Sequence, residues 1–190
     1  MEKKEEEEDE EVMADTVKLI LEMPIHLADQ LIRTADDASS FKTNCFDLKE
    51  KTQTVATLLH QAARIGKDLY ERPTRLVIDD ANQVLEGALT LVQKCRPNCL
   101  VNHLFFQKTS FKLKNSADNL SWLLRISHAV HDGSEGDYLR HSPPLAANEP
   151  VLCFVWEQIA ILSSGSLSHQ LAAAKSLASR SQTTTLATRN

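Results

Sequence analysis

Residues 74–95, TRLVIDDANQVLEGALTLVQKC, decide the fold class because their apolar side chains recur at alternating steps of three and four residues. Such steps place side chains on one face of an α-helix, whereas a half-buried strand would show a period of two. The face is formed by Val77, Ala81, Val84, Ala88, Leu91 and Cys95, and it is widened by Ile78, Leu85, Leu89 and Val92. We therefore expect a deeply buried helix from about Thr74 to Lys94.

The preceding segment repeats this spacing over a longer stretch. Its core-facing positions are Phe41, Cys45, Leu48, Thr52, Val55, Leu59 and Ala62. Ser40 can cap this helix, which we expect to run from Phe41 to about Leu69 and to end before Pro73. Heptad-like steps of this kind are typical of helices that pack at a shallow angle in a bundle.

The N-terminal part predicts one more long helix. Its apolar face consists of Leu27, Leu31, Ala35 and Ala38. Proline is tolerated in the first turn of a helix and disfavoured in its interior. We therefore expect a short helix or turn over residues 13–22 and a separate helix from Pro24 to about Ser39.

The C-terminal half completes an all-α pattern. Residues 100–115 are ambiguous and suggest a short helix or turn, after which a fourth helix runs from Asn115 or Ser116 to about Val130. Residues 132–147 read as a loop, 148–177 as a helical extension and 178–190 as a disordered tail. The predicted fold is an up-and-down four-helix-type bundle over residues 13–131 with a short C-terminal helical extension.

Charge is unevenly distributed. The net charge is -5, but residues 1–12 alone hold eight acidic side chains and two lysines. We expect this acidic extension to be disordered, since like charges repel. The rest of the chain is nearly neutral, which gives no electrostatic reason to expect nucleic acid as a partner.

The sequence shows neither a signal peptide nor a membrane span. Its acidic start is unlike the basic start of a signal peptide. The most apolar stretch, residues 151–162, contains Glu157 and is shorter than the roughly 20 residues that a span needs. We expect a cytoplasmic protein, with the periphery of the plasma membrane and the nucleus as alternatives.

Cysteine and histidine positions give no metal site. Cys95 and Cys99 are close in sequence, but a structural zinc site needs four ligands, and Cys45 and Cys153 lie far away. His128 and His131 have the wrong spacing for a zincin helix. The acidic loop at 132–137 does not match the calcium-loop pattern. We expect four reduced thiols, no metal and no cofactor.

One segment has the composition of a contact surface. Residues 104–114, LFFQKTSFKLK, interleave Phe105, Phe106 and Phe111 with Lys108, Lys112 and Lys114. Aromatic rings beside lysines can enter an anionic membrane surface or meet a partner protein. The alternative is a core-packing turn whose lysines point into water.

Several stretches resemble the N-terminal region of plant armadillo-repeat-only proteins. They are MADTVKLILEMPIHLADQLIRTADDASSFK, LLHQAARIGKDLYERPTRLVIDDANQVLEGALTLVQKC, NSADNLSWLLRIS and PPLAANEPVLCFVWEQIAILSSGSL. The resemblance covers about residues 13–177, and DLYERP and ANEP followed by WEQIAIL are its most specific motifs. It implies a four-helix-type bundle similar to the N-terminal domains of mixed-lineage-kinase-like proteins and of the Cbl adaptor.

The resemblance also implies a scaffold function. The better-known armadillo-repeat-only proteins act in polarised tip growth together with regulators of Rho-type plant GTPases. This sequence departs from them by the acidic extension before Met13 and by the lack of an armadillo array, of which residues 167–177 resemble the first helix. One partial repeat cannot form the usual binding groove, because such repeats are stable only when stacked on neighbours.

These observations favour a non-enzymatic protein-interaction or adaptor module in plant signalling. No nucleophile, base and orienting group recur together, so we expect no enzyme activity. Two alternatives stay open: a peripheral module that binds anionic membrane surfaces through residues 104–114, and a truncated product with little activity.

Overall fold

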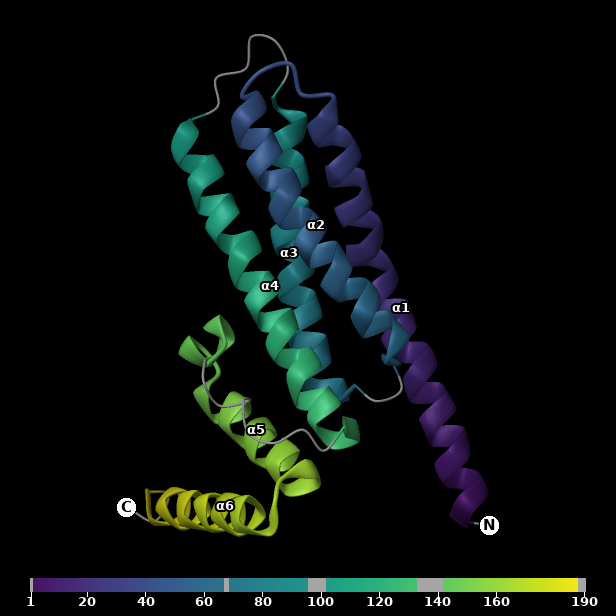
Figure 1. The fold of residues 1–190 in the computed structure, drawn as a ribbon, viewed down its shortest axis with the longest axis vertical. Coiled ribbons are helices and arrows are strands. Elements are labelled where there is room, and N and C mark those ends of the chain that lie inside the picture. Colours follow the sequence, from purple (N-terminus) through teal and green to yellow (C-terminus); the bar gives the residue numbers. More distant parts are fainter. Residues whose placement is uncertain (1, 67–68, 96–101, 133–141, 188–190) are drawn as a thin grey trace. The chain divides into compact units, whose positions relative to one another are not determined.

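The computed structural model describes residues 2–66, 69–95, 102–132 and 142–187. All regular secondary structure in the described residues is helical and none is strand, which confirms the predicted all-α class (Figure 1). The elements are α1 (Glu2–Asp36), α2 (Lys42–Arg64), α3 (Glu71–Gln93), α4 (His103–Asp132), the 3-10 helix η2 (Pro144–Ala147), α5 (Pro150–Ser164) and α6 (Leu167–Ala187).

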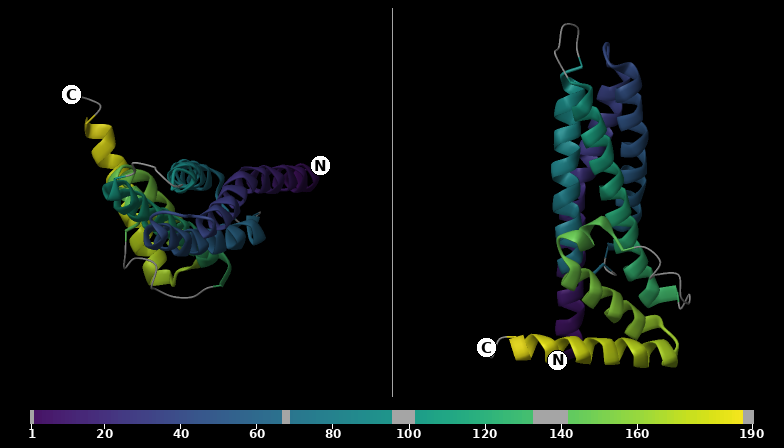
Figure 2. Two further views of the ribbon diagram at one scale, coloured as in Figure 1. Left: turned by 90° about the horizontal axis from the view of Figure 1, so that it is seen from above. Right: turned by 90° about the vertical axis from the view of Figure 1, so that its left-hand side faces the viewer.

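The chain divides into two compact units, Met1–Leu123 and Leu124–Asn190. In the first unit, α1, α2, α3 and most of α4 lie side by side, and successive helices run in opposite directions, as both Figure 1 and Figure 2 show. α1 packs closely against both α2 and α3, whereas α2 and α3 approach each other at few points. This arrangement is the up-and-down bundle that the sequence predicts.

The core of the first unit follows the predicted faces closely. Every face position given above for α3 is buried, as are those of α2 from Cys45 to Ala62. Leu59 and Leu85 have no exposed surface at all. Thr52 is buried too, and its hydroxyl donates to the Leu48 carbonyl at 2.7 Å, so its polar atom is satisfied inside α2.

The predicted break at Pro24 is wrong. α1 runs through this residue as one helix of 35 residues, and Pro24 is buried. An interior proline removes a backbone hydrogen bond and costs about 3 kcal/mol. Val17 and Leu21 before Pro24 and Leu31 after it are fully buried. Each such side chain contributes about 1.5–3 kcal/mol, so packing on both sides outweighs the proline.

The expected short helix or turn over residues 100–115 is also wrong, because α4 begins at His103. Asn102 caps it, since the Leu104 N–H donates to the Asn102 side-chain oxygen at 3.0 Å. Phe106, Leu113 and Leu120 are all buried at intervals of seven residues. The core-facing spacing of the predicted fourth helix therefore extends backwards to Phe106.

Other helix ends differ from expectation by a few residues. α2 ends at Arg64, and α3 begins at Glu71 with Pro73 in its first turn, a position that proline tolerates. α1 begins at Glu2, within the extension that we expected to be disordered. Glutamate is a good helix former and is favoured near a helix N-terminus, which accounts for this difference.

The second unit contains η2, α5 and α6, and α5 packs against both of the others. The Gln170 side chain donates to the Leu162 carbonyl at 3.0 Å across the turn between α5 and α6. α6 continues to Ala187, through most of the tail that we expected to be disordered. The guanidinium of Arg180 lies 4.2 Å from the centre of the Phe154 ring, so this part of α6 contributes to packing.

Candidate functional site

The first half of α4 exposes apolar and basic side chains together. Leu104, Phe105 and Phe111 are 60–65% exposed, and Lys108 and Lys112 are exposed beside them. On a helix, residues separated by three, four or seven positions share a side, so these five residues form one continuous strip. We call this strip the α4 face. Lys114 is exposed at its border, three residues after Phe111.

Phe106, which the sequence grouped with this surface, lies in the core instead. Its side chain is 2% exposed and stacks on Phe41, with ring centroids 5.3 Å apart and an interplanar angle of 29°. It is therefore unavailable to a membrane or partner. The two interpretations of residues 104–114 each describe part of the segment, because Phe106 packs inward while Phe105 and Phe111 are exposed.

Polar contacts to α2 and α3 hold the α4 face in place. The Ser110 hydroxyl donates to the Asp47 carboxylate at 2.6 Å, and the Asn44 amide lies 3.2 Å from the His103 ring nitrogen. Further along α4, the Ser116 hydroxyl donates to Asp80 at 3.3 Å. These contacts, together with Phe106, attach one side of α4 to the bundle and leave the opposite side exposed.

Phe41 is itself an unusual residue. Its backbone has φ 53° and ψ 35°, the left-handed conformation that side chains with a Cβ rarely adopt. It lies just before α2, where a sharp change of chain direction is needed after α1. The stacking of its ring on Phe106 offsets part of this backbone strain, so the α1–α2 connection and the first turn of α4 depend on each other.

The Asp47 carboxylate gives a testable pH dependence. Burial alone would raise the pKa of Asp47, but hydrogen bonds from Lys51 and Ser110 and the charge of Lys51 outweigh it and hold the pKa below its ordinary value. A carboxyl whose pKa is lowered by folding stabilises the folded state above its unfolded pKa, and this contribution is lost as the pH falls through the folded value.

We expect Asp47→Asn to lower the free energy of unfolding at pH 7 by less than about 1 kcal/mol, since this ion pair is half exposed. The difference from wild type should decrease as the pH falls below about 4, and it should vanish only below the lowered folded pKa, where the carboxyl is neutral in both states. Urea unfolding at pH 7 and pH 3 measures it. An equal difference at both pH values would show that charge is not the cause.

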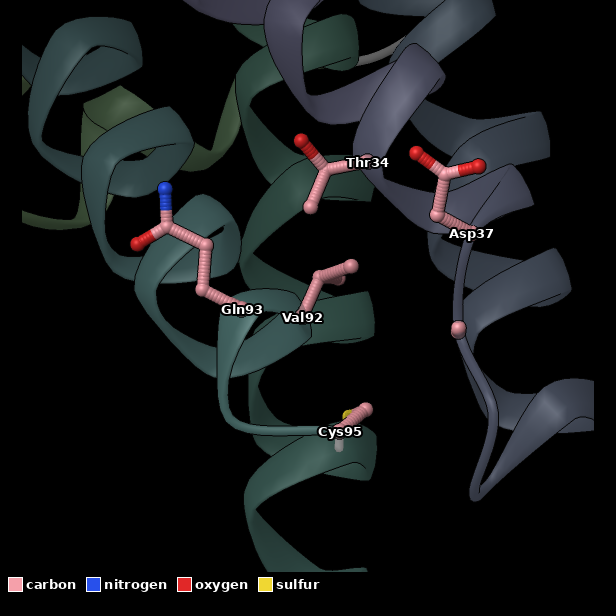
Figure 3. A pocket seen from close by; sticks show the side chains of 6 residues that line it. Thr34, Asp37, Val92, Gln93 and Cys95 are labelled. Atoms are coloured by element: carbon pink, nitrogen blue, oxygen red, sulfur yellow. The ribbon is translucent and has the colours of Figure 1, made fainter. Parts of the chain in front are cut away.

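A pocket of about 590 Å³ lies at the end of the bundle where α1 and α3 finish (Figure 3). Its lining consists of Thr34, Asp37, Ala38, Val92, Gln93 and Cys95. The Cys95 thiol donates to the Leu91 carbonyl at 3.3 Å, and among the lining residues that the structure describes Asp37 is charged and none is a histidine or lysine.

The positions considered for a metal are dispersed or outside the described residues. Within the described part of the chain, no group of three or more His, Cys, Asp or Glu side chains is placed to hold an ion. Cys45, Cys95 and Cys153 are buried, and none of the three is in a disulfide within the described residues. Burial, followed by the nearby charges of Glu157 and Glu149, raises the pKa of Cys153 to about 11. Cys99 and the residues from 133 to 137 lie outside the described chain, and so do the side chains of His128, His131 and Asp132.

Sequence reasoning missed two features of this unit. Leu104 belongs to the α4 face, and its spacing of seven residues from Phe111 was the available signal. The contact between Cys45 and Cys95 joins segments far apart in the sequence, and no local spacing indicates it.

Comparison with known proteins identifies the family but assigns no activity. None of the described helices combines the length and the apolar character that crossing a membrane requires. Neither the comparison with curated proteins nor that with solved structures gave a match, and the resemblance to armadillo-repeat-only proteins stays a prediction. A family described as "Domain of unknown function (DUF7792)" matches residues 18–128, which include α2, α3, nearly all of α4 and the α4 face. The chain therefore belongs to the DUF7792 family.

Proposed function

We propose that this chain is a protein-interaction module whose α4 face docks an acidic, amphipathic segment of a partner protein. The observation that carries the proposal is the exposure of Leu104, Phe105 and Phe111 beside Lys108 and Lys112. The resemblance to armadillo-type scaffolds supports an adaptor role in plant signalling, with regulators of Rho-type GTPases as the partner class that it implies.

Apolar exposure provides the driving force for docking. Burying a large apolar side chain that was previously exposed contributes about 1.5–3 kcal/mol. Three such side chains on one rigid strip favour an occupant with apolar residues at helical spacing, as in the helix-in-groove mode of recognition. Isolated exposed apolar residues are common on proteins, but a contiguous group with a charged rim is typical of interaction sites.

Charge determines the chemistry of the occupant. Lys108 and Lys112 lie within the α4 face and Lys114 borders it, so acidic side chains on the partner meet opposite charges. Such rim charges mainly increase association rate and specificity. An occupant with leucines on one helical side and glutamates flanking them satisfies both requirements.

A membrane surface is the less favoured occupant. Each basic residue near an anionic bilayer contributes about 1 kcal/mol, so three lysines give about 3 kcal/mol, weaker than a millimolar interaction. The acidic residues in 2–11 would be repelled by the same surface. With Phe106 in the core, fewer aromatic rings are available for insertion than the sequence suggested.

The full chain tests the proposal against two probes. One is a synthetic helical peptide with leucines on one side and glutamates elsewhere, together with its lysine counterpart; the other is phosphatidylcholine vesicles containing phosphatidylserine. We expect the glutamate peptide to bind and the lysine peptide and vesicles not to. Phe111→Ser should weaken peptide binding about ten- to hundredfold, and Lys108→Glu with Lys112→Glu about tenfold.

Matched control variants distinguish binding at the α4 face from nonspecific binding elsewhere on the protein. Phe46 is 58% exposed on α2 and Lys94 is exposed after α3, so Phe46→Ser and Lys94→Glu should leave peptide affinity unchanged. Equal losses in these controls would contradict the proposal. Salt-sensitive vesicle binding that Lys108→Glu and Lys112→Glu abolish would favour the membrane function instead.

A further inference from the structure

The Cys45 and Cys95 side chains meet where the α1–α2 connection crosses the end of α3. Cys45 lies in the first turn of α2 and Cys95 follows α3, and their exposed fractions are 0% and 1%. The two side chains lie within hydrogen-bonding reach of each other. Helices that are distant in the sequence thus bring two thiols into direct contact in a dry environment.

Ser40 fixes this arrangement through its backbone. Its N–H donates to the Cys95 carbonyl at 3.3 Å, and its carbonyl accepts from the Cys45 thiol at 4.0 Å. The Ser39 hydroxyl adds a contact to the Cys95 carbonyl at 3.4 Å. The Ser40 backbone therefore joins the start of α2 to the end of α3 at these two cysteines. A disulfide requires that its two residues be held close together in this way.

From this juxtaposition we infer that Cys45 and Cys95 form a reversible disulfide that locks the start of α2 to the end of α3. The oxidant is a low-molecular-weight disulfide of the glutathione class. This pair differs from Cys95 and Cys99, the two cysteines that are close in the sequence. It does not depend on what binds to the α4 face.

The pocket described above sets the order of the reaction. Cys95 is among the residues that line this pocket and Cys45 is not, so we expect the oxidant to approach from the side of Cys95 (Figure 3). The Cys95 thiolate attacks one sulfur of the small disulfide and expels a thiolate. The Cys45 thiolate then attacks the Cys95 sulfur and expels the second. Two protein S–H bonds and one small S–S bond are replaced by one protein S–S bond and two small thiols, and two electrons pass to the oxidant.

The environment makes this reaction slow at neutral pH. Burial raises the pKa of the Cys45 thiol, and the hydrogen bond with Cys95 offsets part of that effect. Since the thiolate is the attacking species, oxidation should accelerate as the pH rises. Once oxidised, a pair of this kind holds the start of α2 against the end of α3. It differs from the exposed, low-pKa cysteines of fast redox sensors.

The test uses the full chain equilibrated with oxidised and reduced glutathione, followed by acid quenching, differential alkylation and peptide mapping. We expect the Cys45–Cys95 cross-link to exceed every other disulfide and dithiothreitol to remove it. The melting temperature should rise by roughly 5–15 °C on oxidation, because the cross-link restricts the unfolded chain.

Single-cysteine variants identify the pair. Cys99→Ser and Cys153→Ser should keep the oxidation-dependent rise in melting temperature, whereas Cys45→Ala and Cys95→Ala should lose it. Peptide mapping of the wild-type protein stands even where a core variant fails to fold. The inference is overturned by a predominant Cys95–Cys99 cross-link, by four thiols that stay free under strongly oxidising conditions, or by oxidation that lowers the melting temperature.

Discussion

Replacing Phe106 by alanine should destabilise the first unit by about 3–5 kcal/mol, whereas the same change at Phe105 or Phe111 should cost well under 1 kcal/mol. Phe106 is 2% exposed and stacked on Phe41, so truncation leaves a cavity and removes a ring contact. Phe105 and Phe111 are at least 60% exposed and leave no cavity. Adjacent phenylalanines in one helix thus provide matched test and control positions.

A single-tryptophan background makes this measurement specific to the first unit. The chain has two tryptophans, of which Trp122 is buried in the first unit and Trp156 lies in the second. With Trp156→Phe in place, Trp122 fluorescence during urea unfolding reports on the first unit alone. Comparable losses of stability for Phe105→Ala and Phe106→Ala would contradict the assigned orientation of α4.

The helices that sequence predicted best are those whose core spacing is unbroken. In α3 and the residues just after it, apolar positions recur from Val77 to Cys95 with no glycine or proline among them. Local spacing alone therefore determines which side of this helix is buried. The register of the start of α4 was harder to assign. Three phenylalanines close together fit both a surface and a core, and only the interval from Phe106 to Leu113 and Leu120 selects the inward one.

Other features depend on contacts between distant segments, which local pattern does not encode. Pro24 carries a local penalty, and it is the burial of α1 on both sides of this residue that overrides it. Likewise, Cys45 and Cys95 come close to each other because the α1–α2 connection reaches the end of α3 through Ser40. The composition of residues 104–114 indicated where the α4 face lies. Which five of these residues belong to it depends on the register of α4, which turns some side chains outward and others inward.

The remaining large effect is expected in the centre of the bundle. Leu59 in α2 and Leu85 in α3 are both fully buried, so Leu59→Ala and Leu85→Ala should each lower the free energy of unfolding by about 2–5 kcal/mol. For a chain of this size, that corresponds to a fall in melting temperature of roughly 5–20 °C. Leu124→Ala, at 6% exposure where α4 passes into the second unit, should cost an amount in the same range.

Leu19→Ala is the matched control, because Leu19 has the same side chain in a helix but is 68% exposed. It should shift the urea midpoint little, since no cavity is created and alanine is a good helix former.

Circular dichroism at 222 nm and Trp122 fluorescence in the Trp156→Phe background should give coincident transitions for Leu59→Ala and Leu85→Ala if the first unit unfolds cooperatively. α1 packs against both α2 and α3, so loss of either leucine weakens the same central helix. A small effect at Leu59 or Leu85, equal to that at Leu19, would mean that these faces do not meet in a common core.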